Sequence, residues 1–277
     1  MWCTRSSSPI GRLMNDRFSV LATMTRSVSQ VEQYEKCPHQ YELQRLKRVK
    51  PRPAAWSHQG TAFHAAAEMY EEGGRKLTAD QVTELFRDDY ARLVNESLAE
   101  ESNLDNWMTA GTDGQSDIEA RYVLGMEQTR AYVQWAGEHE PAIWKDPAGK
   151  PGIETHLTAD IGGVTVQGYV DQLVERPDGS VRVRDLKTGS TKSKFQLQTY
   201  GVLARKVLGV EVNDADWYMA KTGGLSRPVD LTSVTEADVA DRFVKMDQGV
   251  KAGNFPARPG FHCRFCDVSH ACSFRRG

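Results

Sequence analysis

Two strand-like segments joined by a tight turn limit the fold of this chain more than any other feature. Residues 164–174 and 181–187 both alternate in side-chain character, as strands with two different faces do. Between them lies Pro177-Asp178-Gly179-Ser180, a sequence typical of a reverse turn. The sequence therefore predicts a β-hairpin over residues 164–187.

This predicted hairpin carries an acid and a base close together. Asp185 and Lys187 are two residues apart on one strand, so their side chains point to the same face, and Asp171 lies on the neighbouring strand. Two carboxylates that converge from paired strands, with a lysine beside them, can hold a hard divalent cation and position a water molecule. The pattern indicates phosphodiester hydrolysis.

The remainder of the chain alternates between predicted helices and strands. A capping-box pattern, Ser29-x-x-Glu32, predicts the start of a short helix that ends near Cys37-Pro38. We expect residues 1–24 to be a disordered extension and residues 103–115 to be a loop. Apolar spacing predicts helices over 59–72, 79–100, 116–138, 194–208 and 235–252, and strands over 153–160, 163–175, 181–187 and 214–220.

Composition excludes some classes of protein. The 277 residues are 39% hydrophobic and 26% charged, as in an ordinary soluble globular protein, and no apolar run is as long as a membrane span. A cytoplasmic location is expected. The net charge of −2 gives no positive field over the whole molecule, so any contact with nucleic acid must use a local patch.

The cysteines indicate a metal or redox site. Five cysteines in a cytoplasmic chain argue against a disulfide framework. Cys263-x-x-Cys266 is half of a cluster motif, and Cys272 adds a third thiolate close by. Zinc is one candidate, since His262 and His270 are near enough in sequence to complete a site. Cys3 has no partner in this pattern.

The order of these motifs resembles the RecB-like branch of the PD-(D/E)XK nucleases. The resemblance covers roughly residues 25–277 and implies an α/β fold, in which a central mixed sheet is flanked by helices. It implies one nuclease domain with a helical insertion over 75–145, a catalytic core over 150–220 and a cluster-binding tail over 260–274. The motifs that carry it are Ser27-x-Ser29, Cys37-Pro38-x-x-Tyr41, Gly60-x-x-x-His64, Gly168-x-x-Asp171, Asp185-x-Lys187-Thr188-Gly189, Gln196-x-x-x-Tyr200 and Cys263-x-x-Cys266.

The resemblance also implies roles for single residues. The metal, Mg²⁺ or Mn²⁺, is expected to be bound by His64, Asp171, Asp185 and the carbonyl of Leu186. Lys187 is expected to position the attacking water. Three further residues are expected to assist catalysis: Glu154 supports the metal or the water, while Gln196 and Tyr200 contact the DNA backbone or steady Lys187.

Four cysteines are expected to share one cofactor. By resemblance, Cys37 joins Cys263, Cys266 and Cys272 to hold a [4Fe–4S] cluster that joins the two ends of the chain; zinc remains the alternative. The basic stretch that includes Arg45, Lys47 and Arg48 is a candidate for binding DNA phosphates, although such runs are as often solvated surface.

These observations together predict a metal-dependent DNA exonuclease that acts on single-stranded DNA or DNA ends with little sequence specificity. The similarity extends to stand-alone CRISPR-adaptation nucleases and to the nuclease domains of recombination helicase–nucleases, so repair, phage replication and CRISPR adaptation are all candidate settings. No Walker A sequence is present, so the chain carries no helicase motor of its own. A separate helicase or integrase partner and an oligomeric state are both candidates. The alternatives are an endonuclease, a non-catalytic DNA-binding adaptor and a zinc-stabilised interaction protein.

Overall fold

The computed structural model describes residues 24–189 and 193–275. The predicted extension 1–24 therefore lies outside the described residues, except for Met24. None of the described helices is both long and apolar enough to cross a membrane. The helices are α2 (Val28–Lys36), α3 (Pro38–Tyr41), α4 (Ala55–Glu72), α5 (Ala79–Glu100), α6 (Gly114–His139), α7 (Lys194–Leu208) and α8 (Glu236–Lys251). The strands are β1 (Ile153–Ile161), β2 (Val164–Glu175), β3 (Val181–Lys187), β4 (Asp214–Met219), β5 (Gly224–Leu225) and β6 (Val229–Asp230).

The strands form one mixed six-stranded sheet in the order β1-β2-β3-β4-β5, with β6 also paired to β4. β1, β2 and β3 are antiparallel neighbours, whereas β3 and β4 are parallel, and α7 lies between them in the chain. The predicted hairpin is confirmed as β2–β3. Gly179 supplies the positive φ of 82° that its turn requires.

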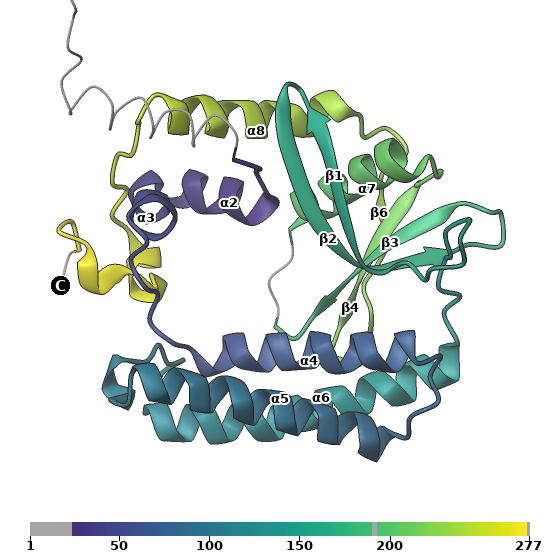
Figure 1. The fold of residues 1–277 in the computed structure, drawn as a ribbon, viewed down its shortest axis with the longest axis horizontal. Coiled ribbons are helices and arrows are strands. Elements are labelled where there is room, and N and C mark those ends of the chain that lie inside the picture. Colours follow the sequence, from purple (N-terminus) through teal and green to yellow (C-terminus); the bar gives the residue numbers. More distant parts are fainter. Residues whose placement is uncertain (1–23, 190–192, 276–277) are drawn as a thin grey trace, which may run out of the picture.

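Helices cover both faces of the sheet, as the predicted fold class requires. On one face, α2, α7 and α8 share a hydrophobic core with the strands. On the other, α4, α5 and α6 form a helical layer that packs on Leu186, Tyr218 and Ala220. Figure 1 shows this layer below the sheet, with α8 at the opposite side of the molecule. The helices of the predicted insertion thus pack against α4. Gly125 of α6 allows α5 and α6 to approach closely, because a Cβ there would lie 1.9 Å from the Phe86 ring.

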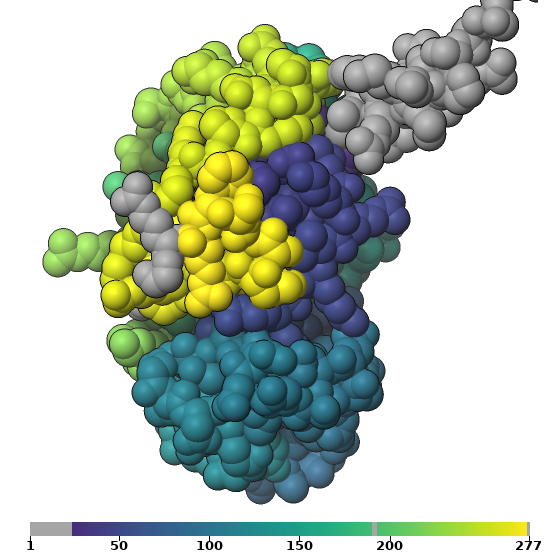
Figure 2. All heavy atoms as spheres, turned by 90° about the vertical axis from the view of Figure 1, so that its left-hand side faces the viewer, coloured from purple at the N-terminus to yellow at the C-terminus, as the bar shows by residue number. Residues whose placement is uncertain are grey.

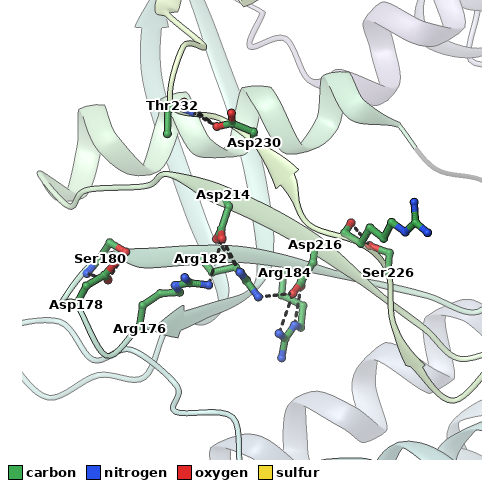
Figure 3. Close-up of polar contacts among 11 residues, drawn as sticks. Arg176, Asp178, Ser180, Arg182, Arg184, Asp214, Asp216, Ser226, Asp230 and Thr232 are labelled. Atoms are coloured by element: carbon green, nitrogen blue, oxygen red, sulfur yellow. Dashed lines mark hydrogen bonds and ion pairs between the residues drawn. The ribbon is translucent and has the colours of Figure 1, made fainter.

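A ladder of ion pairs fixes the register of β3 against β4. Arg182 lies opposite Asp214 and Arg184 opposite Asp216, and each arginine donates two hydrogen bonds to its aspartate. Figure 3 shows the four side chains side by side, with Arg176 reaching Asp214 from the β2–β3 turn. Since breaking one partner of a buried pair leaves an uncompensated charge, a shifted register is strongly disfavoured.

The two ends of the described chain meet. The tail that follows α8 contains two short 3₁₀ helices, η3 (Phe261–Phe265) and η4 (Ser269–Ala271), and it lies against the segment from α2 to the π-helical turn η1 (Glu42–Leu46). Figure 2 shows this tail in yellow directly beside the purple N-terminal segment. Asp267 contributes to the connection, because it accepts hydrogen bonds from Gln40 and Gln44.

Several predicted boundaries were wrong. α2 begins at Val28 after Ser27, so Ser29 lies inside the helix and the predicted capping box does not form; instead the Ser27 and Ser29 hydroxyls are 3.1 Å apart. α4 begins at Ala55, not at residue 59, because Ala55 is buried in the fold and extends the helix toward Pro53. The 103–115 loop contains a 3₁₀ turn, η2 (Leu104–Asn106).

Candidate metal centre and cysteine site

Three carboxylates lie in a row across the sheet. Ile153 pairs with Gln172 and Thr155 with Val170, so Glu154 lies between these pairs beside Asp171. The pairing of β2 with β3 ends at Gln172 and Arg184, and its continuation brings Asp171 beside Asp185. Side chains that are directly opposite in adjacent strands are about 5 Å apart at Cβ. The sheet therefore concentrates negative charge at one place, which needs a cation or protons to be stable.

Helix α4 brings His64 onto this row. Its Nδ1 atom lies 3.5 Å from Asp171 Oδ2 and 3.7 Å from Glu154 Oε1. Ligand atoms of His64, Glu154 and Asp171 all lie within 4.8 Å of one another, so these three side chains can hold a metal ion. Asp185 is next to this group but outside it, since its Oδ2 atom is in ionic contact with Lys187 Nζ at 2.7 Å. The sequence placed Asp185 among the ligands and gave Glu154 a supporting role; the geometry makes Glu154 the nearer donor.

The backbone at Glu154 is unusual. Its φ of 41° lies in the left-handed region, which a non-glycine residue enters at a cost of about 1–3 kcal/mol. Strain of this kind persists where the surrounding structure holds it, and here it accompanies a carboxylate that faces Asp171 and His64. No signal in the sequence marks this conformation.

The peptide group of Leu186 is part of the site. Its N–H donates a hydrogen bond of 2.6 Å to Asp171 Oδ2. In a strand, the N–H and C=O of one residue point toward the same neighbouring strand, so the Leu186 carbonyl also faces β2. This orientation is the one that the predicted backbone ligand needs.

A hydrogen-bonded chain leads from Asp185 to α7. Lys187 Nζ donates to Gln196 Oε1 at 3.1 Å, and Gln196 Nε2 donates to the Tyr200 hydroxyl at 3.2 Å. The Tyr200 ring passes under Gly168, where a Cβ would approach it to 2.6 Å. The structure therefore brings together the predicted residues Lys187, Gln196 and Tyr200, and it favours the reading in which the last two steady the lysine.

Burial and like charges shift the proton affinities of the site. Burial, with Asp185 and Glu154 nearby, raises the pKa of Asp171 to about 7 although His64 opposes the shift. Burial also raises the pKa of Asp185, against the effect of Lys187. Burial lowers the pKa of His64, but the carboxylates of Asp171 and Glu154 outweigh it and raise that pKa to about 9. The His64 side chain is 32% exposed, so its charged form keeps contact with water.

These shifts predict how the stability of the metal-free protein depends on pH. The stabilisation from His64 is complete below its ordinary pKa of 6.5 and is lost as pH rises through about 9. Asp171 acts in the same direction, because its pKa in the folded protein is about 7 rather than the ordinary 3.8, so the folded protein keeps this proton to higher pH. The folded state thus binds more protons than the unfolded state, and the melting temperature in EDTA is expected to fall from pH 5 to pH 9.

A divalent cation must displace these protons, so its stabilising effect is expected to grow over the same pH range. Melting curves with and without Mg²⁺ at each pH measure this difference. A melting temperature in EDTA that rises steadily with pH contradicts the assignment of these charges.

The site opens into a cleft of about 490 Å³. One wall is a face of α4, and the other is Glu154 at the start of β1. The α4 residues that line it are Gly60, Thr61, His64, Ala65 and Glu68. A phosphate group in this cleft can therefore reach His64 and Glu154 without a change in the fold.

Two buried glutamines were not predicted from the sequence. Gln128 of α6 donates from Nε2 to the carbonyl of Thr188, the residue after Lys187, at 3.0 Å. Gln59 of α4 in turn donates to Gln128 Oε1 at 2.7 Å. The insertion helix α6 thereby holds the end of β3. Only the position of Gln59 next to Gly60 could have drawn attention to it; Gln128 lies in a helix without a motif.

Gln128→Ala is expected to lower the rate of any reaction at this site by about 10-fold. This is the lower end of the range for loss of an outer partner of a metal ligand, because Gln128 bonds Thr188, next to Lys187, and no ligand directly. The Thr188 carbonyl loses its donor and Lys187 loses a fixed neighbour. Single-turnover kinetics measure the effect. Gln134→Ala is the matched control, because Gln134 lies on the same helix but bonds Glu138 at the surface; an equal rate for both variants contradicts the role.

Known protein families include one that matches almost the whole of this chain. The family model of the PD-(D/E)XK nuclease superfamily matches residues 25–273. The chain belongs to the PD-(D/E)XK nuclease superfamily. It is also 40% identical over 258 residues to the gene 69 protein of Mycobacterium phage D29, which covers 89% of this chain and 96% of that relative. The gene 69 protein of Mycobacterium phage L5 is 35% identical over 277 residues, with 89% and 95% covered.

Among solved structures, a candidate exonuclease from Eubacterium rectale is similar, with a TM-score of 0.47 and 11% identity over 99% of this chain and 96% of that one.

The four cysteines that are predicted to share a cofactor lie in the N-terminal segment and in the C-terminal tail, which pack against each other. Cys37 Sγ accepts a hydrogen bond from the Arg258 N–H at 3.5 Å, and Cys263 Sγ accepts one from the Gly260 N–H at 3.4 Å. Cys266 is buried, with Cys272 packed against the same small cluster. Burial raises the pKa of the Cys266 thiol. All four are free thiols, and backbone N–H donors already point at two of them.

The basic stretch is largely engaged with its own chain. Lys47 pairs with Glu42 at 3.0 Å, and Lys50 pairs with Glu100 at 2.7 Å. Arg45 is exposed and donates to Gln33 at 3.2 Å, while Arg48 is exposed with a positive φ of 53°. Surface pairs of this kind are weak, so Arg45, Lys47 and Arg48 stay candidates for phosphate binding.

Proposed function

We propose that this chain is a metal-dependent DNA exonuclease that hydrolyses phosphodiester bonds in single-stranded DNA or at DNA ends. The observation that carries the proposal is the row Glu154–Asp171–Asp185 beneath His64, with Lys187 beside it. Superfamily membership supports nuclease chemistry at this row. We assign the whole of 25–277 to one nuclease domain, with 75–145 as insertion, 150–220 as catalytic core and 260–274 as cluster-binding tail.

The residues present fit a divalent cation. Oxygen ligands dominate, as Mg²⁺ and Mn²⁺ require, and Asp185 is a buried carboxylate whose Oδ2 atom lies 2.7 Å from the Lys187 ammonium. We assign His64, Asp171, Asp185 and the Leu186 carbonyl as ligands, and we add Glu154. When bound, the cation supplies Lewis-acid polarisation of the phosphate and a lower pKa for the attacking water.

Lys187 is assigned to orient that water and to balance charge that develops on the phosphate. Its ammonium group lies 2.7 Å from Asp185 and 3.1 Å from Gln196, so two partners define its position. Gln196 and Tyr200 act as positioning residues through this contact. An intact set of acid, acid and lysine supports an enzyme over a non-catalytic adaptor.

For the cysteines we propose a [4Fe–4S] cluster held by Cys37, Cys263, Cys266 and Cys272. Four thiolates with backbone N–H donors to sulfur suit such a cluster. Zinc is the alternative cofactor for the same four thiolates.

We propose a biological setting from the two gene 69 relatives. Both are proteins of mycobacteriophages, which supports phage DNA metabolism over repair or CRISPR adaptation.

The decisive experiment uses anaerobically purified protein and labelled single-stranded, duplex and circular DNA, with Mg²⁺ or Mn²⁺ added back after EDTA. Metal-dependent shortening of linear but not circular DNA is expected. Cleavage of circles instead identifies an endonuclease at the same site. Binding without cleavage under every metal condition overturns the enzyme and leaves the adaptor.

A further inference from the structure

The β1–β2 hairpin exposes one face beyond the metal centre. Along β2 the side chains that point away from the core are Thr165, Gln167 and Tyr169, and along β1 they are His156, Thr158 and Asp160. Most of this face is polar. Tyr169 is the exception, because its large ring is 53% exposed.

Tyr169 is held in a defined orientation although it is exposed. It lies directly opposite His156 in the register of the two strands. The two rings stack with centroids 4.5 Å apart and planes inclined by 20°. His156 Nε2 is also 3.3 Å from the Thr158 hydroxyl. A pre-positioned ring pair loses little side-chain entropy when a flat ligand binds to it.

The ring pair is next to the proposed metal ligands. Tyr169 is two residues from Asp171 on β2, and His156 is two residues from Glu154 on β1. Two residues along a strand span about 7 Å. That distance is comparable to the length of one extended nucleotide. A DNA strand whose phosphate lies at the carboxylates therefore places a neighbouring base over the two rings.

The chemistry of this face selects its ligand. Two stacked rings among hydroxyl and amide side chains are too small and too polar a surface for a protein interface. Any nucleobase presents a π-face, so stacking binds single strands without reading their sequence.

We propose that His156 and Tyr169 form a stacking platform for an unpaired nucleobase next to the scissile phosphate. This proposal rests on the proposed function and names its substrate class. A base paired in a duplex has its faces covered by its neighbours, so the platform favours single-stranded DNA or a frayed end over an intact duplex.

The test measures binding apart from cleavage. In an Asp185→Asn background with Mg²⁺, a single-stranded oligonucleotide that carries 2-aminopurine is titrated with protein. Quenching of the 2-aminopurine fluorescence is expected on binding. Tyr169→Ala is expected to weaken binding by about 5- to 150-fold, the range for loss of one base–aromatic stack, and to remove the quenching. Tyr169→Phe keeps the ring and is expected to keep both.

Tyr122→Ala is the matched control, since this tyrosine lies on α6 beside the separate cleft between α5 and α6. Binding of a blunt duplex is expected to change less than about twofold in all variants. Unchanged single-strand affinity and quenching in Tyr169→Ala overturn the platform. If the wild-type protein binds single strands and quenches the fluorescence but cleaves no DNA, the proposed function fails while the platform stands. If the wild-type protein cleaves DNA, and Tyr169→Ala binds and cleaves equally well, only the platform fails.

Discussion

Asp185→Asn is expected to lower the rate of metal-dependent DNA cleavage by at least about 10³-fold, because loss of even an outer partner of a metal ligand costs 10- to 100-fold. The fold is expected to survive. Asp185 is 1% exposed and burial raises its pKa, so a neutral amide of the same shape removes a disfavoured buried charge. Lys187 keeps its contact with Gln196. Initial cleavage rates and melting curves in EDTA measure the two effects.

Asp178→Asn is the control for this variant. Asp178 lies in the turn at the far end of the same hairpin, where it accepts hydrogen bonds from Ser180, as Figure 3 shows. Its cleavage rate is expected to match the wild type. An Asp185→Asn protein that cleaves at the wild-type rate contradicts the assigned site, and one that fails to fold in EDTA contradicts the assigned electrostatics.

Cys272→Ser is expected to remove the brown colour of anaerobically purified protein and to lower its melting temperature strongly. The proposed cluster links Cys37 to a tail more than two hundred residues later. By the loop-closure estimate, a cross-link over such a span restricts the unfolded chain by about 5 kcal/mol. Its loss removes the covalent link between the tail and the N-terminal helices. The hydrogen bonds of Asp267 and Arg52 and the packing of Leu43 on Cys266 and Val268 then hold the two segments together.

Visible absorbance, iron content and the melting temperature are the measurements. Cys3→Ser is the matched control, at a cysteine outside the described residues, and it is expected to keep colour and stability. A colourless wild type that contains stoichiometric zinc contradicts the iron–sulfur assignment. A Cys272→Ser protein that stays brown and equally stable excludes Cys272 as a ligand.

The sequence by itself determined the local elements and the chemistry they carry. Alternation over 164–187 and the Pro177–Ser180 turn produced the β2–β3 hairpin, because side-chain period and turn chemistry are local properties. The spacing of Asp185 and Lys187 put them on one face for the same reason. The most regular helices, α5 and α7, also agree with prediction, since most of their periodic apolar positions face a core.

Tertiary structure decided what converges on that hairpin. Glu154 came to lie beside His64 through the β1–β2 register and a left-handed backbone, neither of which a local pattern encodes. Gln128 reaches Thr188 across the fold, and the Ser29 cap is absent because the helix starts earlier. Contacts between residues far apart in sequence depend on how whole elements pack, and packing is settled by the burial of the entire core rather than by any one segment.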